Sequence, residues 1–207
     1  MVGRRRVGEA PLNRGVVIAD GHPVTRVGLR ELLDDAGVRV VGECGNGEEA
    51  LRLAREAHPD LVILALDLAS AMDGIRVCWD LKDLPEPPRV LVLTTRDLAG
   101  GVASGLLNSA DGYLHKRTER QEFLETVRRV SSGERVWRLG ERVVDPGNEV
   151  RLTPKEREIL VLVVLGYTDT EMAHTLSIGS ETVKTHTTNV LKKLGAKRRR
   201  EVCKNPP

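Results

Sequence analysis

The stretch DLVILALDLASAMDG, Asp60–Gly74, decides the fold of most of this 207-residue chain. Its apolar run from Leu61 to Ala65 is short, rich in Val, Ile and Leu, and bounded by polar residues. Such a run is typical of a strand buried on both faces of a sheet. The same kind of run occurs at four other places: Val16–Ala19, Val38–Cys44, Val90–Thr94 and Tyr113–Leu114.

Amphipathic segments separate these runs and have helical spacing. They cover Pro23–Asp35, Asn46–Ala57, Ile75–Leu81 and Glu119–Val130. Strands alternating with helices through short loops predict an α/β doubly wound domain, with a parallel five-stranded sheet covered on both faces. A further helix is expected between Thr94 and Asp111. Three glycines in that segment predict that this helix is short, irregular or mobile.

The C-terminal quarter of the chain has helical periodicity only. Thr153 and Pro154 predict the start of one helix, and Gly166 predicts its end. Thr168 or Asp169 is expected to cap a second helix, and Ser180 a third. Two short helices joined by a tight turn, the second basic on its outer side, are typical of a helix-turn-helix that enters the DNA major groove. The predicted divisions are a disordered tail (1–13), an α/β domain (14–132), a linker (133–151) and an all-α domain (152–207).

Charge and composition narrow the class of protein. Residues 150–207 carry 11 Lys and Arg against 6 Asp and Glu, while residues 1–149 carry 21 against 24. A basic end on a mildly acidic chain favours contact with a polyanion. The three cysteines are odd in number and widely spaced, which fits reduced cytoplasmic thiols and not a disulfide framework. Neither a signal peptide nor a membrane-spanning run is apparent, so we expect a cytoplasmic protein without a membrane partner.

The segments TPKEREIL and GYTDTEMAHTLSIGSETVKTHTTNVLKKLGA resemble the LuxR-type helix-turn-helix. That resemblance implies binding to double-stranded DNA, with the third helix in the major groove. The positions implied to face bases are Lys184, Thr185 and Thr188, and those implied to contact phosphates are Thr182, Lys192 and Lys193. The family pairs two copies through a fourth helix, so a homodimer is implied. Here the very basic segment Lys197–Asn205 leads us to expect a shortened dimer surface.

The segments VVIADGHPVTRVGLRELL, VVGECGNGEEALRLAREAHPDLVIL, RVLVLTT and DGYLHK resemble the receiver domain of NarL/FixJ-type response regulators. Receivers of this family hold Mg²⁺ with two acids after the first strand. An aspartate at the end of the third strand accepts a phosphoryl group. A threonine after the fourth strand and a lysine after the fifth contact that group, and an aromatic residue in the fifth strand moves with the switch.

Matched residue by residue, this chain lacks most of the phosphorylation set. The acid pair falls on Asp20 and Gly21, so one acid remains. The phosphoacceptor position falls on Ala65 when counted from Pro59-Asp60, and on Leu66 when counted back from Asp73-Gly74. Asp67 lies two residues further along, where a loop acid is the simpler interpretation. We therefore expect no catalytic residue, no cofactor beyond weak Mg²⁺ at Asp20, and an ion pair between Lys116 and Asp20. The predicted receiver pocket comprises Asp20, Gly21, Ala65, Asp67, Thr94, Tyr113 and Lys116.

Several functions remain open from the sequence. The favoured one is a transcription regulator whose receiver works without phosphate, controlled by dimerisation, expression level or a small ligand at the receiver. The main alternative is a regulator activated by phosphorylation of Asp67. A small phosphatase using Asp20 is disfavoured because no second catalytic acid stands at useful spacing. An interaction protein that never meets DNA is disfavoured by the basic segment Lys184–Arg200.

Overall fold

The computed structural model describes residues 12–68, 71–95, 109–139, 142–143, 152–164 and 166–202. The chain divides into two compact units, the first made of the residues up to Thr94 together with Ala110–Trp137. The second contains the residues from Arg138 onward. The expected tail falls almost wholly outside the described residues, and so does the glycine-rich helix expected before Asp111.

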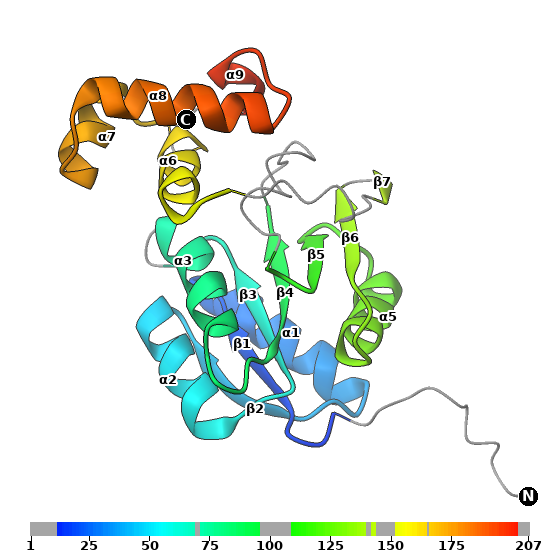
Figure 1. Cartoon of the computed structure of the whole chain (residues 1–207). Coiled ribbons are helices and arrows are strands. Elements are labelled where there is room, and N and C mark those ends of the chain that lie inside the picture. Colours follow the sequence, from blue (N-terminus) through cyan, green and yellow to red (C-terminus); the bar gives the residue numbers. More distant parts are fainter. Residues whose placement is uncertain are drawn as a thin grey trace, which may run out of the picture. The chain divides into compact units, whose positions relative to one another are not determined.

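The first unit is a parallel α/β sheet, as the sequence predicts. The strands of the sheet lie in the order β2-β1-β3-β4-β5-β6-β7 (Figure 1), and the first unit holds all of them up to Trp137 in β6. Every neighbouring pair from β2 to β6 is parallel. The strands are β1 (Val16–Ala19), β2 (Val40–Cys44), β3 (Leu61–Ala65), β4 (Arg89–Thr94), β5 (Gly112–His115) and β6 (Val136–Leu139).

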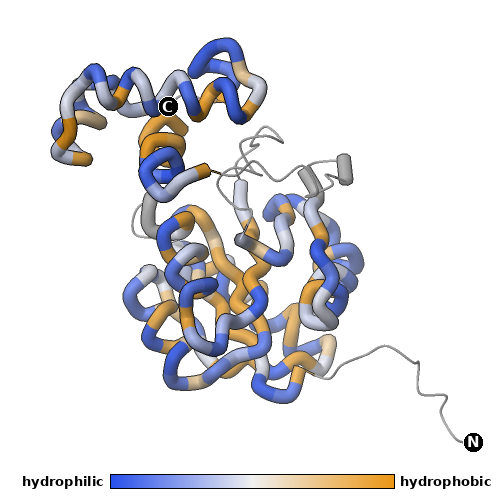
Figure 2. Tube along the Cα trace, in the orientation of Figure 1, coloured by the Kyte–Doolittle hydropathy of each residue, from blue (hydrophilic) through white to orange (hydrophobic). Residues whose placement is uncertain are grey.

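Helices cover both faces of this sheet. The helices are α1 (Pro23–Asp35), α2 (Gly47–Ala57), α3 (Ala71–Lys82) and α5 (Arg120–Ser131). Helices α1 and α5 pack together, as do α2 and α3, so each pair covers one face (Figure 1). Strands β1 and β3 are buried along their whole length, and Figure 2 shows the central strands coloured as hydrophobic. This apolar centre fixes the positions of the loops at the strand ends.

The expectation of five strands is wrong. Strand β6 adds a sixth parallel strand beside β5, and the two-residue β7 (Arg142–Val143) pairs antiparallel with β6. Both lie in the segment assigned to a linker. Val136 and Trp137 are buried. Their apolar run is only two residues long, too short to show the periodicity of a strand.

Helix α3 begins earlier than its apolar pattern suggests, at Ala71 instead of Ile75. Gly74 therefore lies within the helix and not in the loop before it. A Cβ atom at this position would come within 2.6 Å of the Ala65 carbonyl oxygen and the Leu66 Cα. The glycine thus lets the first turn of α3 lie directly against the end of β3.

The second unit is helical in its larger part. It contains α6 (Pro154–Val164), α7 (Asp169–Leu176), α8 (Ser180–Lys193) and the short α9 (Arg199–Val202). Helix α8 packs against α6 and α7, and α9 packs against α6. Thr168 caps α7 through a reciprocal capping box with Glu171. Gly166 has the left-handed backbone (φ 84°) that the sequence predicts after α6.

The expectation that Ser180 caps the third helix is wrong. Gly179 is the N-cap of α8 and makes no side-chain cap hydrogen bond, and Ser180 is the first helical residue. The Gly179 carbonyl already accepts the first intrahelical hydrogen bond, from the Val183 amide at 3.0 Å. A glycine is accepted at this position nearly as well as serine.

Candidate functional site

The carboxyl ends of the central strands bring the predicted receiver residues to one edge of the sheet. Asp20 follows β1, Ala65 ends β3, Thr94 ends β4 and Lys116 follows β5. Open parallel sheets bind their ligands at this edge. The Lys116 amide donates to the Thr94 carbonyl at 2.7 Å, which joins the ends of β4 and β5.

The expected ion pair between Lys116 and Asp20 is present. The Lys116 Nζ atom lies 2.7 Å from Asp20 Oδ2, although the angles are outside hydrogen-bond geometry. Both side chains are buried, with 12% of the lysine and 2% of the aspartate exposed. Direct contact at 2.7 Å in a buried setting is a strong ionic interaction whatever the angle. The only acid of the predicted pair is therefore neutralised from within the protein.

The second oxygen of Asp20 is occupied by His22. Asp20 Oδ1 accepts the His22 amide at 2.9 Å, and the His22 ring Nδ1 lies 3.3 Å away. Arg26 reaches the same loop and donates to the Asp20 carbonyl at 2.7 Å. The sequence does not reveal that His22 and Arg26 contact Asp20. Its only indication is that both residues lie near the start of α1.

Ala65 and Asp67 occupy different kinds of position. Ala65 is the last residue of β3, is 1% exposed, and pairs with Leu93 of β4 in the parallel register. Asp67 lies two residues beyond the strand and is half-buried. The strand end that presents the phosphoacceptor in receivers thus carries a methyl group here.

Gly21 allows the loop after β3 to lie against the loop after β1. The Gly21 amide donates to the Asp67 carbonyl at 3.3 Å. A Cβ atom at Gly21 would come within 2.6 Å of that oxygen. Any side chain at this position, including a second Mg²⁺-binding acid, would therefore require the loop after β3 to move.

The residues at this edge do not fit Mg²⁺. The ion takes oxygen ligands in near-octahedral geometry. Asp20 supplies the only carboxylate of the predicted acid pair, and its two oxygens contact the Lys116 ammonium and the His22 amide. Among the described residues, no group of three or more His, Cys, Asp and Glu side chains could hold a metal ion.

Tyr113 lies inside the domain. It is 1% exposed, and its ring centroid lies 6.3 Å from that of Trp137, which is also buried. The Arg135 guanidinium lies 5.8 Å from the Trp137 ring. The sequence does not identify Trp137 as the partner of Tyr113. Strand β6, which the sequence does not reveal, brings the two rings together.

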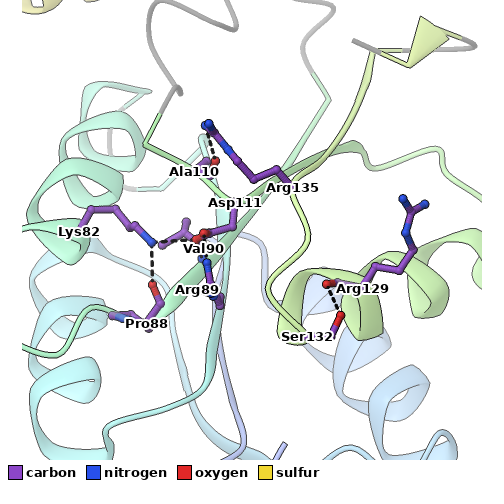
Figure 3. A network of polar contacts seen from close by, with 9 residues as sticks. All are labelled: Lys82, Pro88, Arg89, Val90, Ala110, Asp111, Arg129, Ser132 and Arg135. Carbon is purple, nitrogen blue, oxygen red and sulfur yellow. Dashed lines mark hydrogen bonds and ion pairs between the residues drawn. The ribbon is translucent and has the colours of Figure 1, made fainter. Parts of the chain in front are cut away.

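At the opposite edge of the sheet, Asp111 ties the starts of β4 and β5 together (Figure 3). It accepts hydrogen bonds of 2.8 Å from Lys82 Nζ, Arg89 Nη1 and the Val90 amide. Burial by itself raises the pKa of Asp111. These hydrogen bonds lower the pKa by more than burial raises it, so the net pKa lies below its ordinary value. This network lies at the far edge from the pocket, so its role is structural.

In the second unit, the outer side of α8 carries the residues that the sequence assigns to DNA. Val183 and Val190 are buried and form its inner side. The exposed residues include all six predicted contacts: Thr182, Lys184, Thr185, Thr188, Lys192 and Lys193. Lys184 Nζ contacts Glu181 Oε1 at 2.6 Å, which raises the pKa of Lys184.

Lys193 makes a contact that sequence reasoning missed. Its Nζ lies 2.6 Å from Oε2 of the buried Glu156, which also accepts the Thr153 amide at 2.8 Å. Burial raises the pKa of Glu156, but hydrogen bonds from Lys193 and Thr153 lower it by more, so the net pKa lies below its ordinary value. This ion pair joins the start of α6 to the end of α8, so Lys193 has a structural role in the protein alone.

The two units together define a class of protein: a receiver-like α/β domain joined to a DNA-binding helix-turn-helix. The model of the response regulator receiver domain matches residues 16–128, and that of the bacterial regulatory proteins of the luxR family matches residues 150–204. The chain belongs to the response regulators that combine these two domains, the NarL/FixJ type. Such proteins are DNA-binding transcription regulators and not enzymes.

Relatives match over nearly the whole chain. The nitrate/nitrite response regulator protein NarL of Escherichia coli (strain K12) is 31% identical over 200 residues, covering 91% of this chain and 92% of NarL. The response regulator protein VraR of Staphylococcus aureus (strain NCTC 8325 / PS 47) is 35% identical over 189 residues, covering 86% and 89%. RcsB from Salmonella enterica serovar Typhimurium, bound to promoter rprA with the phosphomimetic BeF₃⁻, matches with TM-score 0.66 and 26% identity, covering 88% and 93%. Among the described residues, no helix is both long enough and apolar enough to cross a membrane.

Proposed function

We propose that this chain is a cytoplasmic transcription regulator whose receiver domain works without aspartyl phosphorylation. One observation carries the proposal: Asp20 and Lys116 are paired at 2.7 Å beside a strand end that carries Ala65. In a receiver, that lysine serves the phosphorylated aspartate. Here the lysine is already paired with Asp20, so no unpaired positive charge at Lys116 is left for a phosphoryl group to neutralise.

The proposal includes the domain division at 14–132 and 152–207 and the DNA contacts of α8. Thr182, Lys192 and Lys193 would approach phosphates, while Lys184, Thr185 and Thr188 would face bases. The exposed outer side of α8 supports this assignment. Control would come from dimerisation or from a small ligand at the receiver. A cytoplasmic location is supported by Cys44 and Cys78, which are buried and form no disulfide bond among the described residues.

The alternative, phosphorylation of Asp67, requires the loop after β3 to rearrange. Phosphoryl transfer depends on in-line placement, and a displacement of about 1 Å lowers the rate about a hundredfold. Asp67 lies two residues past the strand end, which corresponds to about 6.6 Å along an extended chain. Its half-buried position beside the pocket is the observation in its favour.

The decisive experiment is incubation of the full chain with a small phosphodonor and Mg²⁺, followed by intact-mass measurement. The proposal predicts no adduct of one phosphoryl group. An adduct that forms on the wild-type chain and is lost in Asp67→Asn would establish the alternative. A receiver protein with an intact phosphoacceptor aspartate, treated in parallel, checks that the phosphodonor is active.

DNA binding is tested separately by fluorescence anisotropy with duplexes selected from a random library, at several salt concentrations. The proposal predicts preference for the selected sequence and a logarithmic affinity that falls linearly with the logarithm of salt. Equal binding to random and selected duplexes would contradict the base-facing role of α8.

A further inference from the structure

On the outer side of α8, the hydroxyl groups of two threonines are hydrogen-bonded to the backbone of the same helix. Thr185 Oγ1 donates to the Glu181 carbonyl, and Thr188 Oγ1 donates to the Lys184 carbonyl, both at 2.9 Å. Both residues are exposed. The single hydroxyl proton of each side chain is therefore already used inside the helix.

The groups left for a partner on each side chain are the γ-methyl and the acceptor lone pairs of the hydroxyl oxygen. A hydroxyl bonded back to the preceding turn keeps its acceptor lone pairs but offers no proton to a base. Residues 185 and 188 are three apart, so their Cβ atoms lie about 5–6 Å apart on one strip of the helix surface. This strip presents two methyl groups side by side.

The bases differ in the hydrogen-bonding and apolar groups that they present in the major groove. Guanine N7 and O6, adenine N7 and thymine O4 need donors, and adenine N6 and cytosine N4 need acceptors. The C5-methyl of thymine needs an apolar neighbour. The nearby Lys184 ammonium is one donor on this surface, and it lies 2.6 Å from Glu181 Oε1. Donor recognition and methyl recognition thus fall to different side chains.

We infer that Thr185 and Thr188 determine specificity by packing their methyl groups on thymine C5-methyl groups. The inference rests on the proposed base-facing role of α8 and adds to it the base feature that is read. It predicts that the preferred sequence places thymines, on either strand, beside the positions that these two residues reach.

The test uses the duplex selected from a random library by the full wild-type chain, made once with thymine and once with deoxyuridine. Deoxyuridine removes only the C5-methyl and keeps the base pair. Thr185→Ser and Thr188→Ser remove the protein methyl and keep the hydroxyl. Thr185→Val and Thr188→Val keep the shape and remove the hydroxyl.

Burial of one methyl or methylene group is equivalent to about a fourfold change in affinity. Each serine variant should therefore bind the thymine duplex about fourfold more weakly than wild type. Deoxyuridine should weaken each serine variant about fourfold less than it weakens wild type, because only the methyl contact of the other threonine remains to be lost. Each valine variant should bind within about twofold of wild type. The deoxyuridine duplex should weaken wild type and the valine variants alike.

A matched control lies on α7. Thr175 is exposed, and its hydroxyl donates to the Glu171 carbonyl at 2.8 Å, so it repeats the same local geometry outside the recognition helix. Thr175→Ser and Thr175→Val should leave affinity and sequence preference unchanged. Thermal unfolding of every variant shows whether a loss of binding is a loss of folding.

The inference is overturned if the valine variants lose as much affinity as the serine variants, or if the deoxyuridine duplex binds as well as the thymine duplex. Failure of the underlying proposal is a separate result: Lys184→Ala would then leave both affinity and the selected sequence unchanged. If Lys184→Ala weakens binding while the methyl substitutions have no effect, α8 reads DNA but does not read thymine methyl groups.

Discussion

Removing the Lys116 ammonium should destabilise the receiver domain far more than removing the Asp20 charge. Breaking a buried pair by deleting one partner leaves an uncompensated buried charge and costs about 3–5 kcal/mol. In Lys116→Met that charge is on Asp20, which is only 2% exposed and cannot reach water. The expected loss lies at the upper end of this range.

The reverse substitution is milder for a structural reason. In Asp20→Asn the side-chain oxygen can still accept the His22 amide hydrogen bond, now 2.9 Å long. The remaining charge is on Lys116, which is 12% exposed and has a long flexible stem. We expect a loss of about 1–2 kcal/mol. The double variant should lose less stability than the sum of the losses in the two single variants, because the second substitution removes the charge that the first left unpaired.

Urea unfolding followed by tryptophan fluorescence measures these differences in the full chain. The chain has two tryptophans, Trp79 and Trp137, and both lie in the first unit, so the signal reports that unit alone. The reasoning is refuted if the free energy of unfolding of Lys116→Met lies within about 0.5 kcal/mol of the wild-type value. It is also refuted if Asp20→Asn loses as much stability as Lys116→Met.

Three further predictions concern other parts of the structure. Thr187→Val should stabilise the second unit by about 1 kcal/mol in circular-dichroism melts, because the buried Thr187 hydroxyl has no hydrogen-bond partner among the described residues; an unchanged or lower melting temperature would contradict this. The pKa of Asp111 is lowered from its ordinary value of 3.8, so its stabilising contribution is complete above that value and is lost as pH falls through the lower folded pKa; Asp111→Asn should remove this part of the acid sensitivity in urea unfolding measured from pH 7 downward. Lys192→Ala should reduce the slope of log affinity against log salt by about 0.9, whereas Lys193→Ala should change it less and destabilise the second unit, because it leaves the buried Glu156 without its cation; equal changes in the salt slope would contradict this.

The order of strands and helices was predictable because each buried strand is a continuous apolar run. Leu61–Ala65 is apolar at every position, and β3 covers the same residues. Asn46 was predictable as the cap of α2, and its side chain accepts the Glu49 amide at 2.9 Å. Such signals are local, so one sequence is enough to find them.

Strand β6 could not be predicted, because what stabilises it is not local. It pairs with β5 through Val136 and Trp137, and the Trp137 ring meets Tyr113 from a distant part of the chain. The same applies to the contact between Lys193 and Glu156, which joins residues 37 positions apart. The pair of Asp20 and Lys116 was predictable only because the resemblance to receivers placed both residues in one pocket.

Titration of ¹⁵N-labelled protein with Mg²⁺ and beryllofluoride, followed by amide NMR, tests the central claim most directly. The proposed loss of the phosphoacceptor, with Lys116 paired to Asp20, predicts that the amides of Asp20, Asp67 and Lys116 keep their positions throughout the titration. Saturable shifts of these amides that disappear in Asp67→Asn would mean that the domain accepts a phosphoryl mimic, and would contradict the claim.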